Sequence, residues 1–208
     1  MPLCHLSCLR TVAIVTAYLK ASANDEHRHR HELPYEPRSM TAPIGLRHRH
    51  AVRRKAVGPL LDRLIVDFHL DPNLVSGQIE RAEWGDWTVL LINRIPWVVE
   101  IMSPSGRPCV SLTLRGLLAQ SPSVRWVEVD RGAVPFLLNG ADCMVAGVHD
   151  ADPNILAGDL VWIRDQEHKK PLALGWSLLD VPELVDSMNG KGVQTVHWIG
   201  DELWSLEA

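Results

Sequence analysis

The sequence predicts an α+β region at residues 40–123, followed by a small, mostly β barrel at residues 124–208. Three observations support this fold class. Apolar residues recur every three or four positions from Val52 to Phe68, which is the periodicity of an amphipathic helix. Short apolar runs bounded by turn residues follow, as is typical of strands. Glycines then become frequent between similar runs, which favours tight turns in a compact β domain.

Residues 1–39 are predicted to be a disordered or loosely attached extension. They show no apolar periodicity around the charged segment 24–32, and two prolines follow it closely. The apolar run at residues 11–19 is shorter than the roughly 20 residues of a membrane-spanning helix. With its flanking basic residue and a small-residue segment, this run also resembles a signal peptide. Met40 is an alternative start of the protein.

The dipeptide Gly58-Pro59 interrupts the helical pattern. Either two short helices meet there, or Pro59 begins the stronger one, since proline is well tolerated in the first turn of a helix. Arg53, Arg54 and Lys55 lie on the polar side near the start of the pattern. We therefore expect an amphipathic helix that is basic at its N-terminal end.

Strands are expected after this helix. Two strand-like runs, residues 87–92 and 96–101, are joined by the turn residues Asn93 and Arg94. Residues 110–118 are expected to be a strand that passes into a short helix. The segment Ser121-Pro-Ser123 is interpreted as the linker that ends the α+β region.

The C-terminal region begins with a strand and a short helix. Residues 127–130 alternate between apolar and polar types, as a strand does, and residues 133–138 suit one short helical turn. Asn139-Gly140 then imposes a turn. Residues 160–163 form a continuous apolar run, which is typical of a strand buried on both faces. A compact β-rich domain is therefore predicted.

Five C-terminal segments resemble the PUA domain, the module named after pseudouridine synthases and archaeosine transglycosylases. These segments are residues 127–148, 155–163, 171–176 with Gly175, 189–193 and 197–204. The last of them, together with residues 113–118 just upstream of the barrel, is similar to the malignant T-cell-amplified sequence family, and to its archaeal members in particular. Proteins of that family join an N-terminal domain to a C-terminal PUA domain, and the resemblance extends from about Arg53 to the C-terminus.

The resemblance implies a set of RNA contacts, because the RNA surface of PUA domains forms around the first helix and the following strand. The implied contacts are Gly132, Ala133, Asn139, Gly140, Ala141, Met144, Ala146, Gly147 and Val148, with Gly190, Lys191 and Gly192 nearby. Small residues such as glycine also let another backbone approach closely, which suits the binding of a single-stranded RNA end. The alternative is that these glycines only satisfy turn geometry. Ala146 and Asp142 depart from the family pattern, in which proline and a basic residue are common.

Charge is distributed unevenly along the chain. Residues 125–208 carry 6 basic and 14 acidic side chains, a net charge of −8, whereas residues 40–124 carry 10 and 7, a net charge of +3. The barrel is therefore not expected to bind RNA by broad attraction to phosphates, which needs several Lys or Arg residues. The cluster Arg53, Arg54 and Lys55 is the candidate contact for ribosomal RNA phosphate, and a solvated helix face is the alternative.

No catalytic residues, metal or cofactor are predicted. The sequence contains no nucleophile elbow, phosphate-binding loop or cofactor-binding glycine motif. Histidines alternate at His27, His29 and His31, but no fold there is expected to form the spaced pairs of a zinc site. The four cysteines lack a disulfide-framework spacing, which favours reduced thiols and a cytoplasmic protein. Most of the eight tryptophans are interpreted as core or interface residues, with Trp126 at a domain interface.

The resemblance implies a non-enzymatic RNA-binding translation factor that acts at the small ribosomal subunit. It would contact the 3′ end of tRNA, ribosomal RNA or both, in initiation, reinitiation or recycling, with a partner similar to density-regulated protein. Two alternatives remain open. The protein is either an accessory subunit that presents RNA to a tRNA or rRNA modification enzyme, or a protein-docking module that no longer binds RNA.

Overall fold

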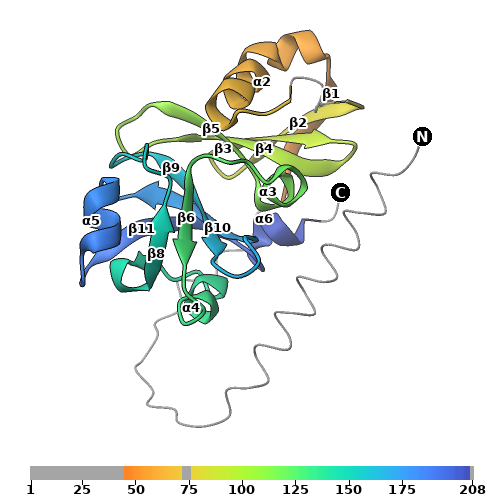
Figure 1. Ribbon diagram of the computed structural model, residues 1–208. Coiled ribbons are helices and arrows are strands. Elements are labelled where there is room, and N and C mark those ends of the chain that lie inside the picture. Colours follow the sequence, from red (N-terminus) through yellow and green to blue (C-terminus); the bar gives the residue numbers. More distant parts are fainter. Residues whose placement is uncertain (1–44, 72–75, 207–208) are drawn as a thin grey trace. The chain divides into compact units, whose positions relative to one another are not determined.

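The computed structural model describes residues 45–71 and 76–206, which lie in one compact unit, residues 44–208. The predicted extension at residues 1–39 lies outside the described residues. The described chain forms two sheets, a five-stranded one with the order β1-β2-β3-β4-β5 and a six-stranded one with the order β7-β11-β10-β9-β6-β8 (Figure 1). An α+β region followed by a mostly β domain with a curled mixed sheet confirms the predicted fold class. The boundary at residue 123 stays a prediction.

The first sheet is antiparallel throughout, and one helix covers a face of it (Figure 1). Its elements are β1 (Arg47–Val52), α2 (Arg54–Phe68), β2 (Ile79–Trp84), β3 (Trp87–Ile92), β4 (Ile95–Met102) and β5 (Pro108–Leu112). Val57, Leu61, Leu64 and Phe68 form the buried stripe of α2, as the periodicity predicts. Both alternatives for Pro59 were wrong, because a single helix begins at Arg54 and Pro59 lies inside it.

The sequence pattern did not predict β1 or β2. The reason is that β1 is a charged edge strand, whose polar side chains find partners only across the sheet. His48 Nδ1 lies 2.8 Å from a carboxylate oxygen of Glu83, and Arg49 Nε donates to Glu80 at 2.8 Å. Charged side chains on an edge strand also discourage pairing with other chains.

The second sheet curls around its own core. The helix α3 (Leu114–Gln120) follows β5 and leads to this part of the chain. The elements after α3 are β6 (Trp126–Val129), α4 (Val134–Leu138), β7 (Cys143–Met144), the 3₁₀ turn η2 (Val145–Gly147), β8 (Val148–Ala151), β9 (Leu160–Asp165), β10 (Pro171–Ser177), α5 (Val181–Asp186), β11 (Lys191–Trp198) and α6 (Glu202–Ser205). Strands β6 and β9 are parallel. Val127, Val129 and Ile163 are fully buried and form the centre of the core with Leu137 of α4. The predicted strand, short helix and apolar strand at residues 127–163 are confirmed.

A buried polar network joins α3 to β11 and α6 near the C-terminal end of the described chain. The Leu114 N–H donates to His197 Nε2 at 3.5 Å, so the ring proton lies on Nδ1, which donates to Asp201 Oδ2 at 2.6 Å. Arg115 of the same helix donates to the Trp204 carbonyl at 2.8 Å. These bonds attach the helix of the α+β region directly to β11 and α6. Within the described ranges, no helix is long and apolar enough to cross a membrane.

Candidate nucleic-acid interface

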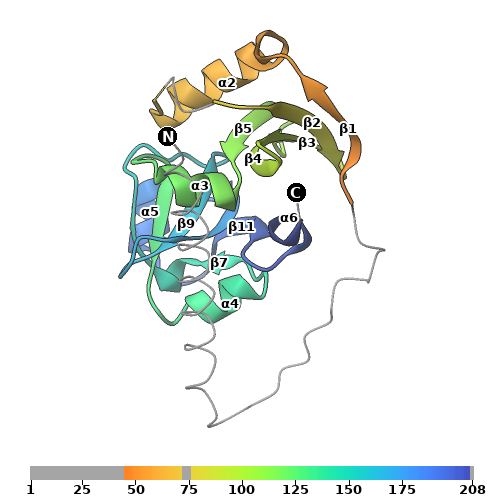
Figure 2. The same cartoon turned by 90° about the vertical axis from the view of Figure 1, so that its right-hand side faces the viewer.

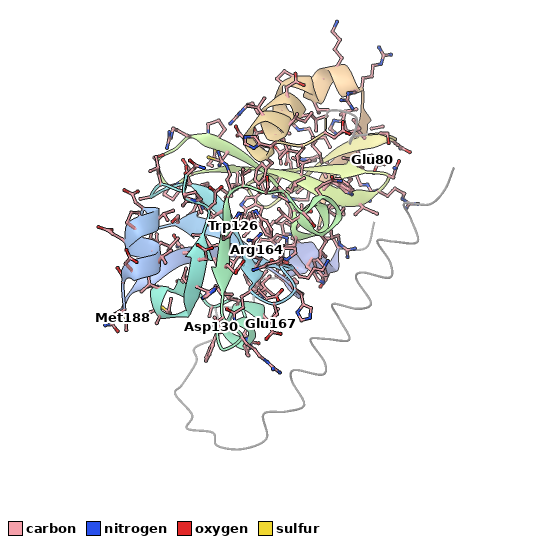
Figure 3. The ribbon with its side chains drawn as sticks, viewed as in Figure 1. Glu80, Trp126, Asp130, Arg164, Glu167 and Met188 are labelled. Carbon is pink, nitrogen blue, oxygen red and sulfur yellow. The ribbon has the colours of Figure 1, made fainter. Side chains whose placement is uncertain are left out.

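A cavity of about 280 Å³ opens beside α4, and Figure 3 labels Asp130 at this end of the second sheet. The lining comes from the loop after β6, from α4, and from β7 with the turn η2. The lining residues are Asp130, Gly132, Ala133, Phe136, Leu137, Asp142, Cys143, Met144, Ala146 and Gly147. Four of the ten are glycine or alanine, so backbone forms much of the wall.

The cavity exists because two turns approach each other without side chains between them. A Cβ atom at Gly147 would lie 2.9 Å from the Ala133 Cβ, so only glycine lets η2 pack this close to the start of α4. Asp130 fixes the same loop, since its Oδ1 accepts the Ala133 N–H at 2.9 Å and its own N–H donates to the Gly147 carbonyl at 3.0 Å. The walls are therefore held in place by close backbone packing and by the hydrogen bonds of Asp130.

Two large apolar side chains stand exposed at the cavity. Phe136 is 67% exposed and Met144 is 49% exposed, whereas their neighbours Leu137 and Cys143 are buried. An exposed aromatic ring beside a hollow of small residues is a surface on which a flat, apolar face can stack. Phe136 thus presents an exposed aromatic ring at the edge of the cavity.

The charges around the cavity disfavour a phosphate inside it. Asp130 and Asp142 both line the wall. Asp142 Oδ1 accepts the Thr195 N–H at 3.1 Å, and Asp142 Oδ2 lies 2.9 Å from Lys191 Nζ. Lys191 is thus already paired, and two carboxylates repel a phosphate while they accept hydrogen bonds from a neutral base.

The structure brings five of the predicted contacts into the cavity wall. They are Gly132, Ala133, Met144, Ala146 and Gly147. The predicted contacts Asn139, Gly140, Ala141 and Val148 do not line it. Pairing of β7 with β11 places Lys191 opposite Met144, and the Val145 N–H donates to the Gly190 carbonyl at 3.0 Å. The late glycine-lysine-glycine segment therefore lies beside the site.

Packing explains two of the predicted glycines. A Cβ atom at Gly140, where φ is +76°, would lie 2.8 Å from the Trp198 ring. A Cβ atom at Gly192 would lie 2.7 Å from Leu184 Cδ1 and 3.2 Å from Val145 Cγ1. Both positions face protein atoms, so the missing side chains let these elements pack together.

The remaining predicted contacts lie elsewhere in the fold. Arg53, Arg54 and Lys55 are exposed at the start of α2, which packs on the first sheet and not beside the cavity (Figures 1 and 2). The first turn of α2 contains no acidic residue. Its basic side chains therefore lie at the positive end of the helix dipole, where positive charge is unfavourable. Within residues 45–71 and 76–206, no group of three or more metal-ligating side chains gathers.

The predicted site omitted five lining residues, Asp130, Phe136, Leu137, Asp142 and Cys143. The signal for Phe136 is absent from the pattern, because Val134 to Leu138 contains only apolar residues and proline. Which of them turns outward depends on how the five-residue helix packs on the sheet. Asp130 is a turn residue whose backbone role is visible only once η2 is folded against it.

Cys143 gives a chemical test of the cavity wall. The pKa of this thiol is raised to about 12, mainly by burial and to a lesser extent by the negative charges of Asp130 and Asp142. Thiolate is the reactive form, so at pH 8 only about one Cys143 in ten thousand is reactive. We expect iodoacetamide to label Cys109 much faster than Cys143 at pH 8, as measured by site-resolved mass spectrometry. In denaturant the two rates should converge. Equal rates in the native protein would contradict the buried position of Cys143.

A small curled sheet with a glycine-walled cavity beside its first helix defines a PUA-domain protein. The sequence profile described as PUA domain matches residues 125–199. An uncharacterized protein of Methanocaldococcus jannaschii is 32% identical over 164 residues, which cover 78% of this chain and 98% of that protein. The chain therefore belongs to the same family as this archaeal protein and contains a PUA domain, and it is similar to proteins named malignant T-cell-amplified sequence.

Other relatives agree with this assignment. Translation machinery-associated protein 20 of Schizosaccharomyces pombe is 37% identical over 82 residues, 38% of this chain and 45% of that protein. A malignant T-cell-amplified sequence 1 homologue of Drosophila melanogaster is 32% identical, over 44% of this chain and 52% of that protein. The matches thus span about half the length of these eukaryotic relatives. The crystal structure of a hypothetical protein from Pyrococcus horikoshii superposes with a TM-score of 0.63 at 27% identity, covering 75% of this chain and 97% of that one.

Proposed function

We propose that this protein is a non-enzymatic RNA-binding translation factor that acts at the small ribosomal subunit. The cavity beside α4 holds an unpaired nucleotide at the 3′ end of a tRNA. Family membership supports RNA binding and a role in translation, since relatives carry names such as translation machinery-associated protein 20. By mechanism the protein positions RNA rather than reacting with it.

One observation carries the nucleotide assignment. Phe136 exposes 67% of its surface directly beside a hollow whose walls are glycine, alanine and two carboxylates. A base inserted there stacks on the ring, and its amino group has carboxylate acceptors within the cavity. The phosphates of the same nucleotide remain outside, because the wall is acidic.

A second part of the protein is proposed to contact ribosomal RNA. Arg53, Arg54 and Lys55 face solvent at the start of α2 and supply the positive charge that the acidic barrel lacks. Basic side chains of this kind bind phosphates without reading sequence. A partner similar to density-regulated protein is proposed to assist on the ribosome, as the family resemblance implies.

Replacing Phe136 by alanine is expected to weaken tRNA binding about 5- to 150-fold, because stacking of a base on an aromatic ring is worth about 1–3 kcal/mol. Fluorescence anisotropy with intact tRNA and with tRNA trimmed of its unpaired 3′ nucleotides measures the effect. The variant should lose affinity for intact tRNA only. Leu156→Ala is the matched control, since Leu156 is a large apolar residue that is 61% exposed outside the cavity. Equal affinity of Phe136→Ala and the native protein for intact tRNA would rule out this site.

Ribosome sedimentation, an affinity pull-down and UV crosslinking together separate the proposed function from its two alternatives. We expect the protein to co-sediment with the small subunit and tRNA. Recovery of a modification enzyme in place of ribosomal proteins would favour an RNA-presenting accessory subunit. A stable protein partner without any crosslink to RNA would favour a docking module.

A further inference from the structure

Three arginines from separate segments gather around Cys109 at the edge of the first sheet. Arg63 of α2 donates from Nη2 to the Pro108 carbonyl at 2.7 Å, so its guanidinium lies beside the residue that links Arg107 to Cys109. Asp67, one turn further along α2, lies 4.0 Å from Nη2 of Arg125. Arg63 and Arg107 therefore lie at the start of the edge strand β5, and Arg125 lies against α2 one turn from Arg63; we call these three residues the arginine cluster.

The arginine cluster has more positive charge than its neighbours compensate. Within the described parts of the chain, only Arg125 of the three is in an ion pair, and its Nη2–Oδ2 distance to Asp67 is at the limit for one. Arg63 contacts a carbonyl, and Arg107 donates from Nε to the Ser105 hydroxyl oxygen at 3.3 Å. Neither contact neutralises a guanidinium. Like charges held close together repel one another, and an anion between them removes that cost.

The same three positive charges affect the pKa of the Cys109 thiol. Burial raises its pKa, while the positive charges of Arg107, Arg125 and Arg63 act in the opposite direction. Asp159 is the acidic group that also acts on this thiol, and its Oδ2 already accepts the Leu156 N–H at 3.0 Å. Cys109 is half-buried and therefore reachable by reagents.

We infer that the arginine cluster binds phosphodiester groups of RNA, at a site separate from the cavity beside α4. This inference rests on the proposed function, because it adds a second contact for the same RNA. Guanidinium groups bind phosphate oxygens in bidentate fashion and remain charged at all physiological pH values. Such contacts position the RNA backbone and carry no base specificity.

The two sites bind different parts of the RNA. Helix α2, which carries Arg63, and helix α4, which borders the cavity, lie at opposite ends of the described unit in both views (Figures 1 and 2). One nucleotide cannot reach both places. The cavity therefore recognises an unpaired end, and the arginine cluster holds backbone phosphates elsewhere along the molecule.

The test is the salt dependence of tRNA binding by the double variant Arg63→Glu with Arg107→Glu. We expect the dissociation constant to rise about tenfold or more at low salt. The slope of log affinity against log salt should become shallower by about 1.5, since each lost phosphate contact removes about 0.7–0.9. The ratio of affinities for intact and 3′-trimmed tRNA should stay unchanged, because the cavity is untouched. Bound RNA should also slow the alkylation of Cys109.

Arg94→Glu is the matched control. Arg94 is exposed in the turn before β4, whereas Arg107 follows the far end of that strand. Eight residues of strand separate them by about 25 Å. The control makes the same charge change per site and should leave the salt slope unaltered. Thermal unfolding of each variant shows whether the fold is retained, and Arg63→Lys with Arg107→Lys should keep the slope even if the glutamate variant is unstable.

The outcomes separate the two proposals. Native protein that binds no RNA under any condition overturns the proposed function and with it this inference. Native protein that binds RNA with a salt slope shared by the double variant overturns the arginine cluster alone. Loss of an acidic protein partner from the double variant, with RNA binding intact, would assign the cluster to that partner and likewise reject the inference.

Discussion

Asp201→Ala is expected to lower the free energy of unfolding by about 3–5 kcal/mol, because it leaves several buried donors without an acceptor. Asp201 is only 8% exposed, and it accepts hydrogen bonds from the His197 ring at 2.6 Å and from the backbone N–H groups of Trp198 at 3.1 Å and Trp204 at 2.7 Å. Urea denaturation followed by tryptophan fluorescence gives the change in midpoint.

The same carboxylate holds more than its own turn. Through His197 it fixes the acceptor for the Leu114 N–H at the start of α3, so its loss also loosens the connection between the two sheets. Asp186→Ala is the control, since Asp186 is an exposed acid in α5 and surface substitutions usually change stability by less than about 0.5 kcal/mol. Equal midpoints for the two variants would show that the network contributes nothing to stability.

Gly175→Ala is expected to destabilise the protein by about 3 kcal/mol, the upper end for adding a methyl group to a packed core. A Cβ atom at this position would lie 2.4 Å from the Gln194 carbonyl oxygen and 2.7 Å from Val193 Cγ1. The register of β10 against β11 shifts between Leu174 and Gly175, and this irregularity brings the two backbones together. A backbone oxygen cannot move aside as the end of a side chain can.

Gly58→Ala is the matched control for this substitution and should have the opposite sign. Gly58 lies inside α2, and a Cβ atom there would meet no atom within 4 Å. Alanine in a helix interior is more stable than glycine by about 0.5–1 kcal/mol. Thermal unfolding of the two single variants compares them directly. A gain shared by both would mean that backbone entropy, and not the close approach at Gly175, governs the result.

Large parts of the fold could be predicted from the pattern of apolar residues. The buried stripe of α2 follows from helical periodicity, and the strands at 87–92, 96–101 and 160–163 follow from short apolar runs, because these strands are largely buried. Strand β1 could not be predicted this way. Its charged side chains are satisfied by Glu80 and Glu83, more than 30 residues away, as the sequence separations of these contacts show.

The candidate site, too, could be predicted from the sequence only in part. Gly132, Ala133 and Gly147 could be predicted from the sequence, because the resemblance to PUA domains implies contacts at these positions. The orientation of Phe136 could not, since all its helical neighbours are apolar or proline and packing alone decides which one faces outward. The sequence also could not distinguish the glycines that border the cavity from Gly192, where Leu184 occupies the space that a side chain would need.

The sequence by itself determined the order of elements, the acidic character of the C-terminal region and the family resemblance, because all three depend on residue types and on spacing along the chain. Tertiary structure decided which side chains meet. Folding alone pairs Lys191 with Asp142, brings His197 to the start of α3 and gathers Arg63, Arg107 and Arg125 around Cys109. These residues are 18 to 83 positions apart, so their contacts arise from sheet pairing and helix packing and not from local preference.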